Sequence, residues 1–344
     1  MVLQPERRLE LRQVPEPVLG GPGEVLLRVT TAAICASDLH AKQGLIPGVR
    51  PGTVMGHEFV GVVVQKGQAV TRFQPGDRVA APAAVWCGVC PACRRGEAQY
   101  CQKGGIWGAG DIFGPGLDGA QTGLVRVPYA DNCLCPIPDS VSDEQAVFVG
   151  DVLSTGFHAA LQARIRPGDL VVVLGCGPIG LASLICAWQF GPRQVLAVDT
   201  LDNRLALARR YGATALDASQ GRVAEQVRQA SQGAGADVVI EAIGNPDTFL
   251  LALDLARRGG SVSVVGMFSQ KVNFPLGKMA AHGLNLSMGL GSLLHMERLM
   301  GLLVCGRLDL QPLVSHVFGL EQALEAYDLF ENHKDQCLKV LLKP

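Results

Sequence analysis

The sequence lacks a charge bias, a basic stripe, a long apolar run and internal repeats. Its 30 Lys and Arg residues are balanced by 31 Asp and Glu, for a net charge of −1, which argues against nucleic acid as a partner. No apolar run is long enough to span a bilayer, so we expect no membrane partner. Residues 1–12 are charged and mixed rather than basic and then apolar, which predicts no signal peptide and a cytoplasmic protein.

The chain is rich in cysteine and glycine, with 11 Cys and 42 Gly among 344 residues. Because a cytoplasmic protein keeps its thiols reduced, the cysteines indicate metal ligands and buried thiols rather than a disulfide framework. The length exceeds that of one usual hydrophobic core and predicts two domains. A hydrophobic share of 48% and a charged share of 18% fit a compact α/β protein.

A glycine-rich turn follows the apolar run Leu170–Leu174, which has the length and β-branched character of a buried strand. The turn has the pattern GxGxxG, and a helix-compatible stretch and a second apolar run come after it. Gly175 permits a tight turn, Gly177 lets the backbone approach a pyrophosphate, and Gly180 allows close packing of helix on strand. The free N–H groups at the start of the helix would bind the phosphates.

Asp199 ends the second apolar run, 19 residues after Gly180. A carboxylate at that place accepts hydrogen bonds from the hydroxyls of an adenosine ribose and repels a 2′-phosphate. The sequence therefore predicts a site for NAD rather than NADP. The alternative is a sharp turn in an α/β sheet that binds nothing.

Four cysteines between residues 87 and 101 have the spacing C-x2-C-x2-C-x7-C; they are Cys87, Cys90, Cys93 and Cys101. Four thiolates this close can surround one tetrahedral zinc ion and leave no open position, which is typical of a structural site. We call this segment the four-cysteine lobe. An iron–sulfur cluster and a loop of unligated thiols are the other interpretations.

Four further metal-competent residues stand at predicted turns: Cys35, His57, Glu58 and Asp151. One thiolate, one imidazole and one or two carboxylates give three ligands and an open place, as in catalytic zinc sites. No close spacing links them, however. Cys35 also fits a buried thiol, His57 a loop histidine and Asp151 a helix N-cap, so the residues alone leave a second metal site open.

The order of predicted elements separates two architectures. Short strands with glycine turns at 23–33, 59–64 and 77–81 predict a small barrel-like β domain. From residue 168 to about 274, strands alternate with helices and predict a doubly wound, mostly parallel sheet. We expect a helix over 143–164 at the crossover, helices over 296–306 and 321–329, and a last strand over 336–342 that rejoins the β domain.

The chain resembles a zinc-dependent medium-chain alcohol dehydrogenase over essentially its whole length. The matching motifs are Ile34-Cys35-Ala36-Ser37-Asp38-Leu39-His40, Gly56-His57-Glu58-Phe59-Val60-Gly61, the four-cysteine lobe, Asp151-Val152-Leu153-Ser154-Thr155-Gly156, and the turn 175–180. Ala36 replaces the family's usual glycine. The resemblance implies a GroES-like catalytic domain over 1–150, a NAD-binding Rossmann domain over 151–290, and a segment 291–344 that returns to the catalytic domain.

The resemblance also implies roles for the motif residues and two zinc ions per chain. Cys35, His57 and Asp151 would hold a catalytic zinc, and Glu58 would be an extra ligand or a neighbour that swings in during ligand exchange. The four-cysteine lobe would hold a structural zinc. Ser37 and His40 would relay a proton, although His40 also fits a turn cap. The cofactor residues would be Thr155 at the nicotinamide, Gly175, Gly177, Pro178, Ile179 and Gly180 at the phosphates, and Asp199 and Arg204 at the ribose.

The activity implied is reversible hydride transfer between a small alcohol and NAD, giving an aldehyde or ketone. A polyol or formaldehyde-type dehydrogenase on the same scaffold is the alternative, and a non-catalytic NAD(H)-binding zinc protein is a third possibility. The family forms homodimers and homotetramers, often through the last strands of the cofactor sheet, here about 283–291.

Two smaller points concern side chains outside these motifs. Trp107 and Phe113 either line the substrate pocket or pack under the four-cysteine lobe. The remaining cysteines are expected to be core thiols; they are Cys133, Cys135, Cys176, Cys186, Cys305 and Cys337.

Overall fold

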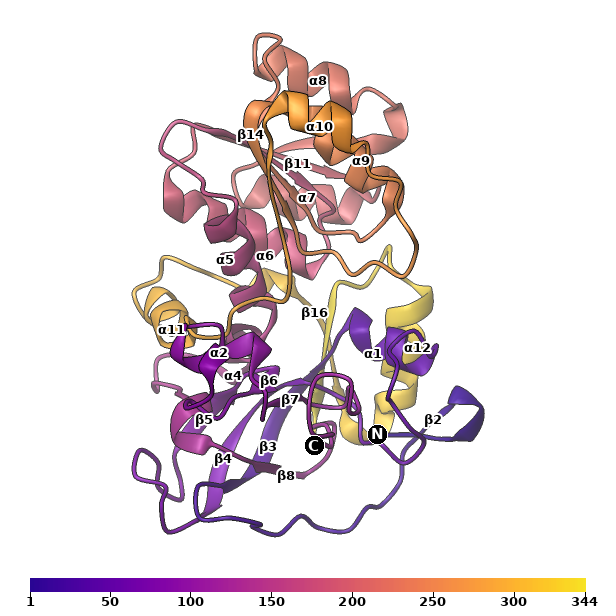
Figure 1. Cartoon of the computed structure of the whole chain (residues 1–344). Coiled ribbons are helices and arrows are strands. Elements are labelled where there is room, and N and C mark those ends of the chain that lie inside the picture. Colours follow the sequence, from indigo (N-terminus) through magenta and orange to yellow (C-terminus); the bar gives the residue numbers. More distant parts are fainter. The chain divides into compact units, whose positions relative to one another are not determined.

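The computed structural model describes residues 1–344 and divides into two compact units (Figure 1). Unit 1 comprises residues 1–154 and 292–344, and unit 2 comprises residues 155–291. No helix combines the length and the apolar character needed to cross a bilayer.

Unit 2 is built on a six-stranded sheet in which all neighbouring strands are parallel. The order is β12-β11-β10-β13-β14-β15. The strands are β10 (Leu170–Leu174), β11 (Gln194–Asp199), β12 (Thr214–Asp217), β13 (Ala236–Glu241), β14 (Ala256–Val264) and β15 (Asn285–Met288). Numbered from β10, this is the order 3-2-1-4-5-6 of the Rossmann fold. The predicted doubly wound sheet is confirmed.

Helices on both faces bury the middle of this sheet. All five residues of β10 are buried, as its β-branched run requires of a strand covered twice. The helices of this part of the chain are α5 (Val152–Gln162), α6 (Pro178–Ala187), α7 (Asp202–Arg210), α8 (Val223–Ala230), α9 (Pro246–Leu255) and α10 (Leu276–His282). In α6 every residue from Gly180 to Ala187 is buried, so this helix lies against its neighbours on all sides.

Unit 1 is organised around the ten-residue strand β3 (Val25–Ile34). On one side β3 pairs with β4 (Glu58–Lys66); on the other it pairs with β8 (Leu124–Val127) along its first part and with β17 (Lys339–Lys343) along its last. The full order is β16-β17-β3-β4-β5-β9, with β5 (Arg78–Ala81), β9 (Cys135–Pro136) and β16 (Val314–Gly319). The end of the chain therefore lies in the same sheet as its first long strand.

Short elements complete unit 1. They are β1 (Val2–Leu3), β2 (Leu9–Glu10), β6 (Ala84–Val85), β7 (Gly105–Ile106), α1 (Ala36–Lys42), α2 (Pro91–Arg94), α3 (Ala130–Cys133), α4 (Asp143–Ala146), α11 (Met296–Val304) and α12 (Ala323–Asn332). The sequence did not indicate the β6–β7 pair, because two-residue strands carry no periodic signal.

The prediction of a single helix over 143–164 is wrong. The segment consists of α4, a 3-10 helix over Val147–Gly150 and α5, with a break at Asp151, where φ is −141° and ψ is −74°. The cause lies at Gly150, whose carbonyl accepts a hydrogen bond from the Ala83 N–H at 2.9 Å. A Cβ on Gly150 would lie 2.0 Å from the Ala81 carbonyl oxygen, so the chain is pressed against the end of β5 just before Asp151.

The structure also corrects one of the core-thiol assignments. Cys305 is exposed, whereas the other five cysteines outside the candidate metal clusters are buried. Cys305 caps α11, whose buried residues Met296, Leu299, Met300 and Leu303 follow helical spacing, and it lies beyond that apolar stripe.

Trp107 belongs to the core of unit 1. Its ring packs edge to face on Phe59 with centroids 5.3 Å apart, and its Nε1–H donates to the Pro82 carbonyl at 2.7 Å. With 1% of its surface exposed, Trp107 does not line an open pocket, and Phe113 is 39% exposed.

Gly180 makes the most severe close approach in unit 2. A Cβ there would lie 1.7 Å from the Gly175 carbonyl oxygen, which is fixed backbone. We expect Gly180→Ala to lower the free energy of unfolding by at least about 2 kcal/mol. Gly277 is the matched control, because it lies in α10 with nothing within 4 Å of its missing Cβ. Gly277→Ala should stabilise by about 0.5 to 1 kcal/mol. Urea unfolding of the full chain measures both, and equal effects of the two changes would contradict this packing.

Candidate functional site

Strand register brings the first three candidate metal ligands together. Ala33 of β3 pairs with Glu58 of β4, so the end of one strand lies beside the start of the other. Cys35 follows β3 directly and is the N-cap of α1, while His57 immediately precedes β4. Asp151, at the helix break, is placed near them by two contacts. Gly150 packs against the backbone of Ala81, and Ala81 pairs with Phe59, the residue after Glu58.

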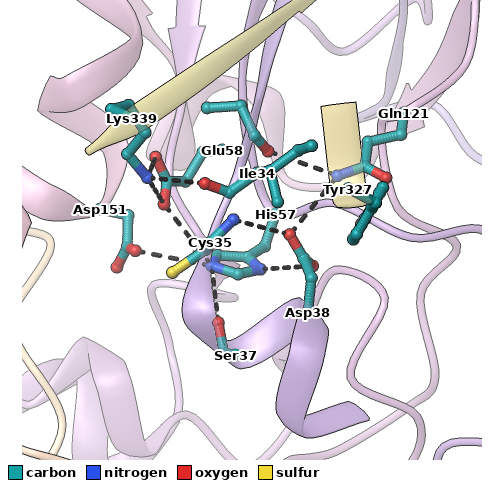
Figure 2. A network of polar contacts seen from close by, with 11 residues as sticks. Ile34, Cys35, Ser37, Asp38, His57, Glu58, Gln121, Asp151, Tyr327 and Lys339 are labelled. Carbon is teal, nitrogen blue, oxygen red and sulfur yellow. Dashed lines mark hydrogen bonds and ion pairs between the residues drawn. The ribbon is translucent and has the colours of Figure 1, made fainter. Parts of the chain in front are cut away.

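The donor atoms of Cys35, His57, Glu58 and Asp151 all lie within 4.8 Å of one another (Figure 2). His57 Nε2 lies 3.5 Å from Asp151 Oδ2 and 3.9 Å from Glu58 Oε1. The other ring nitrogen, Nδ1, faces Asp38 Oδ1 at 3.6 Å. A proton on Nδ1 directed at Asp38 would leave the Nε2 lone pair turned toward the cluster.

The cluster carries an excess of negative groups. Burial alone would lower the pKa of His57, but its interactions with Asp151 and Asp38 outweigh burial and raise the pKa well above its ordinary value. Burial would likewise raise the pKa of Asp151, yet His57 lowers it. Sulfur, nitrogen and carboxylate donors at this spacing, in a locally anionic site, fit a zinc ion.

Two predicted proton-relay residues lie on α1 beside this cluster. The Ser37 hydroxyl is 3.2 Å from His57 Nε2 (Figure 2). His40 is three residues further along the helix and therefore on the same face. It is partly buried, and burial followed by the charge of Lys334 lowers its pKa. A lowered pKa leaves His40 neutral, and able to accept a proton, at neutral pH.

Lys339 is a site residue that the sequence analysis missed. Its Nζ donates to Glu58 Oε1 and Oε2, each at 2.7 Å, and to the Ile34 carbonyl at 3.2 Å. Burial alone would lower the pKa of Lys339, but the Glu58 carboxylate raises it. The available signal was a lone charge before the apolar run Val340–Leu342, at a place where a strand buries its side chains.

A second missed group supports the histidine. Asp38 Oδ2 accepts the Cys35 N–H at 2.9 Å and the Gln121 side-chain amide at 3.4 Å. The Tyr327 hydroxyl donates to Gln121 Oε1 at 2.8 Å. Asp38 stands within the first quoted motif, but no local pattern links it to Gln121 or Tyr327, which lie far along the chain.

The four-cysteine lobe forms the other cluster, with all four sulfurs within 4.8 Å. Cys90 is 3.5 Å from Cys93 and 3.8 Å from Cys101, and Cys101 is 3.5 Å from Cys87, all measured between sulfurs. A tetrahedral site with Zn–S bonds of about 2.3 Å has edges of about 3.8 Å. The Cys87 and Lys103 N–H groups also donate hydrogen bonds to the Cys101 sulfur. This lobe fits one zinc ion.

In unit 2 the glycine turn connects β10 to α6, with Gly177 as the N-cap and Pro178 as the first residue of the helix. Gly175 has φ of +90°, in the left-handed region that favours glycine. A Cβ on Gly177 would meet only an Arg204 nitrogen, at 4.0 Å, so one side of the turn is open. An open N-terminus with a missing side chain fits a phosphate group.

Asp199 and Arg204 lie beside this turn. Asp199 Oδ2 accepts the Cys176 N–H at 2.7 Å, and Oδ1 accepts the Thr200 and Leu201 N–H groups at 2.8 and 3.1 Å. One terminal nitrogen of Arg204 is 3.7 Å from Asp199 Oδ2, while its buried Nε has no hydrogen-bond partner. An unpaired buried guanidinium N–H beside an open turn fits an additional acceptor from a bound nucleotide.

Thr155 lies in α5 next to Gly156, where the helix touches α6. A Cβ on Gly156 would lie 2.6 Å from the backbone of Ala182, and one on Gly291 would lie 2.7 Å from Thr155 Oγ1. The Gly156 contact therefore places Thr155 beside α6, and the Gly291 contact packs a second backbone segment against Thr155.

Comparisons with known proteins decide the family. Residues 21–139 match the alcohol dehydrogenase GroES-like domain, and residues 178–303 match the zinc-binding dehydrogenase domain. An alcohol dehydrogenase of Cupriavidus necator is 38% identical over 358 aligned positions, covering 98% of this chain and 96% of its relative. The chain belongs to the zinc-dependent medium-chain alcohol dehydrogenases.

Solved structures of this family agree with the fold. The alcohol dehydrogenase TADH from Thermus sp. ATN1 superposes with a TM-score of 0.94 at 40% identity, covering 99% of this chain and 98% of the other. A putative zinc-binding dehydrogenase from Sinorhizobium meliloti 1021, solved with NADP, has a TM-score of 0.89 at 28% identity. The superposition covers 100% of this chain and 98% of the other.

Membership in the zinc-dependent medium-chain alcohol dehydrogenases fixes the reaction class. The chain is an oxidoreductase that interconverts alcohols and carbonyl compounds with zinc and a nicotinamide cofactor. The sequence-based predictions of family, fold class, reaction class and these cofactors are confirmed.

Proposed function

We propose that Cys35, His57 and Asp151 hold the catalytic zinc and leave one position for the substrate oxygen. The observation that carries this assignment is the convergence of their donor atoms within 4.8 Å of one another. A zinc ion at this place acts as a Lewis acid that lowers the pKa of a substrate hydroxyl. The three residues hold and orient the ion, and Asp38 holds the His57 ring through Nδ1.

Ser37 and His40 carry the proton of the substrate hydroxyl away. The Ser37 hydroxyl lies within hydrogen-bond reach of the donor cluster, which supports its contact with a substrate oxygen. His40 lies on the same face of α1 and, with its lowered pKa, is neutral and able to accept the proton. In the direction of carbonyl reduction the same two side chains return the proton.

Unit 2 binds NAD as the hydride acceptor. The residues Gly175, Gly177, Pro178, Ile179 and Gly180 surround the pyrophosphate, and Asp199 accepts hydrogen bonds from the adenosine ribose. Thr155 contacts the nicotinamide. The open side of Gly177 and the unpaired Arg204 Nε support this placement. The Asp199 carboxylate favours NAD because it would repel the 2′-phosphate of NADP.

A second zinc ion in the four-cysteine lobe has a structural role. Four thiolates saturate a tetrahedral ion and leave no position for substrate, so this ion stabilises the lobe alone. The chain then holds two zinc ions.

The enzyme assembles as a homodimer or homotetramer through the cofactor sheet. Strand β15 supports this, because it is the edge strand of the sheet and pairs only with β14, and an unpaired edge is a place where a strand of a second copy can add. Met288, in this strand, is 62% exposed.

Cys35→Ser tests the catalytic ligand set. We expect this variant to bind one zinc ion instead of two. Its turnover should fall by at least about 100-fold, because the loss of a residue that only supports a metal ligand costs up to about 100-fold and Cys35 is proposed as a ligand itself. The variant should still fold, because the four-cysteine lobe is untouched, with an unfolding free energy lowered only by the contribution of the lost ion. Zinc content by elemental analysis and NADH absorbance with a panel of primary, secondary, aromatic and polyol alcohols measure both.

Cys305→Ser is the matched control, because Cys305 is exposed and outside both clusters. It should keep both ions and full turnover. Two ions and full turnover in Cys35→Ser would refute the assignment.

Asp199→Asn tests cofactor choice and keeps one side-chain oxygen, which can accept either the Cys176 N–H or the Thr200 and Leu201 N–H groups. Removing the charge should shift the ratio of kcat/KM for NAD over NADP toward NADP by about 10-fold or more, since hydrogen bonds to charged groups contribute about 1.5 to 3 kcal/mol. Asp217→Asn, at the end of the neighbouring strand β12, should leave the ratio unchanged. An unchanged ratio in Asp199→Asn would show that another residue selects the cofactor.

A further inference from the structure

The Lys339–Glu58 ion pair is the most deeply buried charge pair near the candidate zinc site (Figure 2). The two side chains are 1% and 0% exposed. All three ammonium hydrogens have acceptors at the distances observed, namely both Glu58 oxygens and the Ile34 carbonyl. Lys339 therefore binds the carboxylate through both of its oxygens and also contacts the backbone that leads into Cys35.

The site has a closed side and an open side. Glu58 and Lys339 have essentially no exposure, whereas the Asp151 side chain is 17% exposed and Cys35 is partly exposed. Glu58 thus approaches the donor cluster from the closed side, where Lys339 is also located. In the proposed site, substrate therefore enters from the side of Cys35 and Asp151, where the exposure is greater.

Lys339 and a metal ion compete for the same carboxylate. If Glu58 turned to become a fourth protein ligand, Lys339 would keep only the Ile34 carbonyl among the acceptors it now has. A buried ammonium without its counter-ion is strongly disfavoured, so the ion pair opposes that movement.

The charges of the site point the same way. The Cys35 thiolate and the Asp151 carboxylate together balance a divalent cation, and the Lys339–Glu58 pair is neutral by itself. Without Lys339, the buried Glu58 carboxylate would lack a counter-ion, and the nearest available cation would be the metal.

We propose that Lys339 is a positioning residue that holds Glu58 off the zinc ion, so that the fourth coordination position stays available to substrate. This inference rests on the proposed ligand set of Cys35, His57 and Asp151. Glu58 then enters the coordination sphere only when the ion pair opens. Lys339 therefore controls the fraction of molecules in which Glu58 occupies the position meant for substrate.

The test measures access to that position without turnover. Both zinc ions are replaced by Co²⁺ in the full chain, and imidazole is titrated while the Co²⁺ absorption spectrum is recorded. The four-cysteine lobe, saturated by its thiolates, gives no response. In Lys339→Met, Glu58 should occupy the position and weaken imidazole binding by about 10-fold or more, because only the unblocked fraction of molecules binds.

Three further variants make the result specific. Lys339→Arg keeps the positive charge and should retain the wild-type imidazole affinity. Lys343→Met removes the Lys343–Glu144 ion pair at the other end of β17 and should also have no effect. The double variant Lys339→Met with Glu58→Gln should restore the affinity to within about threefold, since no carboxylate remains to block the position.

Wild-type affinity in a folded, Co²⁺-loaded Lys339→Met variant would overturn the inference. If that variant does not fold, the double variant Glu58→Gln with Lys339→Gln, which carries no charge at either position, decides. Wild-type imidazole affinity in this double variant supports the proposal. Imidazole binding about 10-fold tighter than in the wild type means that Glu58 already blocks the position in the native protein, which contradicts the proposal. Failure of the proposed function looks different, because a wild-type chain that binds a single Co²⁺, in the four-cysteine lobe, would have no catalytic metal site to regulate.

Discussion

The antiparallel pairing of β3 with β4 is the constraint on which the candidate active site depends. It fixes Ala33 opposite Glu58, so a thiol just beyond one strand and an imidazole just before the other must meet. A shift of one residue would turn every side chain of a strand to the opposite face of the sheet. The pairing of Phe59 with Ala81 and the contact of Gly150 with Ala81 then bring in Asp151. The convergence of these candidate ligands is thus a consequence of strand register and of one glycine contact.

Each buried charged group around this point faces a partner of complementary character. Asp38 faces one nitrogen of His57 and Asp151 the other, while Lys339 engages Glu58. Both Lys339 and Tyr327 come from the last part of the chain, which returns to unit 1 beside β3. The C-terminal segment therefore does more than complete the sheet, since it supplies the counter-ion of Glu58 and supports Gln121, which in turn binds Asp38.

Much of this could be predicted from the sequence, for identifiable reasons. The run Leu170–Leu174 with its glycine turn identified the Rossmann sheet, because a strand buried on both faces has a distinctive composition. The four cysteines lie within one short segment, so their spacing by itself indicated a metal cluster there, which the convergence of their sulfurs supports. Cys35, His57 and Asp151 are far apart in sequence, and only the resemblance to a family connected them.

Other features have no local signal. The helix break at Asp151 arises from a contact with β5, and the apolar pattern of 143–164 continues through it. Lys339 and Gln121 act through partners that are far away in the sequence, and a two-residue strand such as β6 has no periodicity.

The most direct measurement of the proposed metal sites is anomalous scattering at the zinc edge from crystals of the unmodified chain. Two peaks per chain are expected, one among the four cysteine sulfurs and one bounded by Cys35 Sγ, His57 Nε2 and an Asp151 oxygen. A map without the second peak would contradict the proposed catalytic metal site.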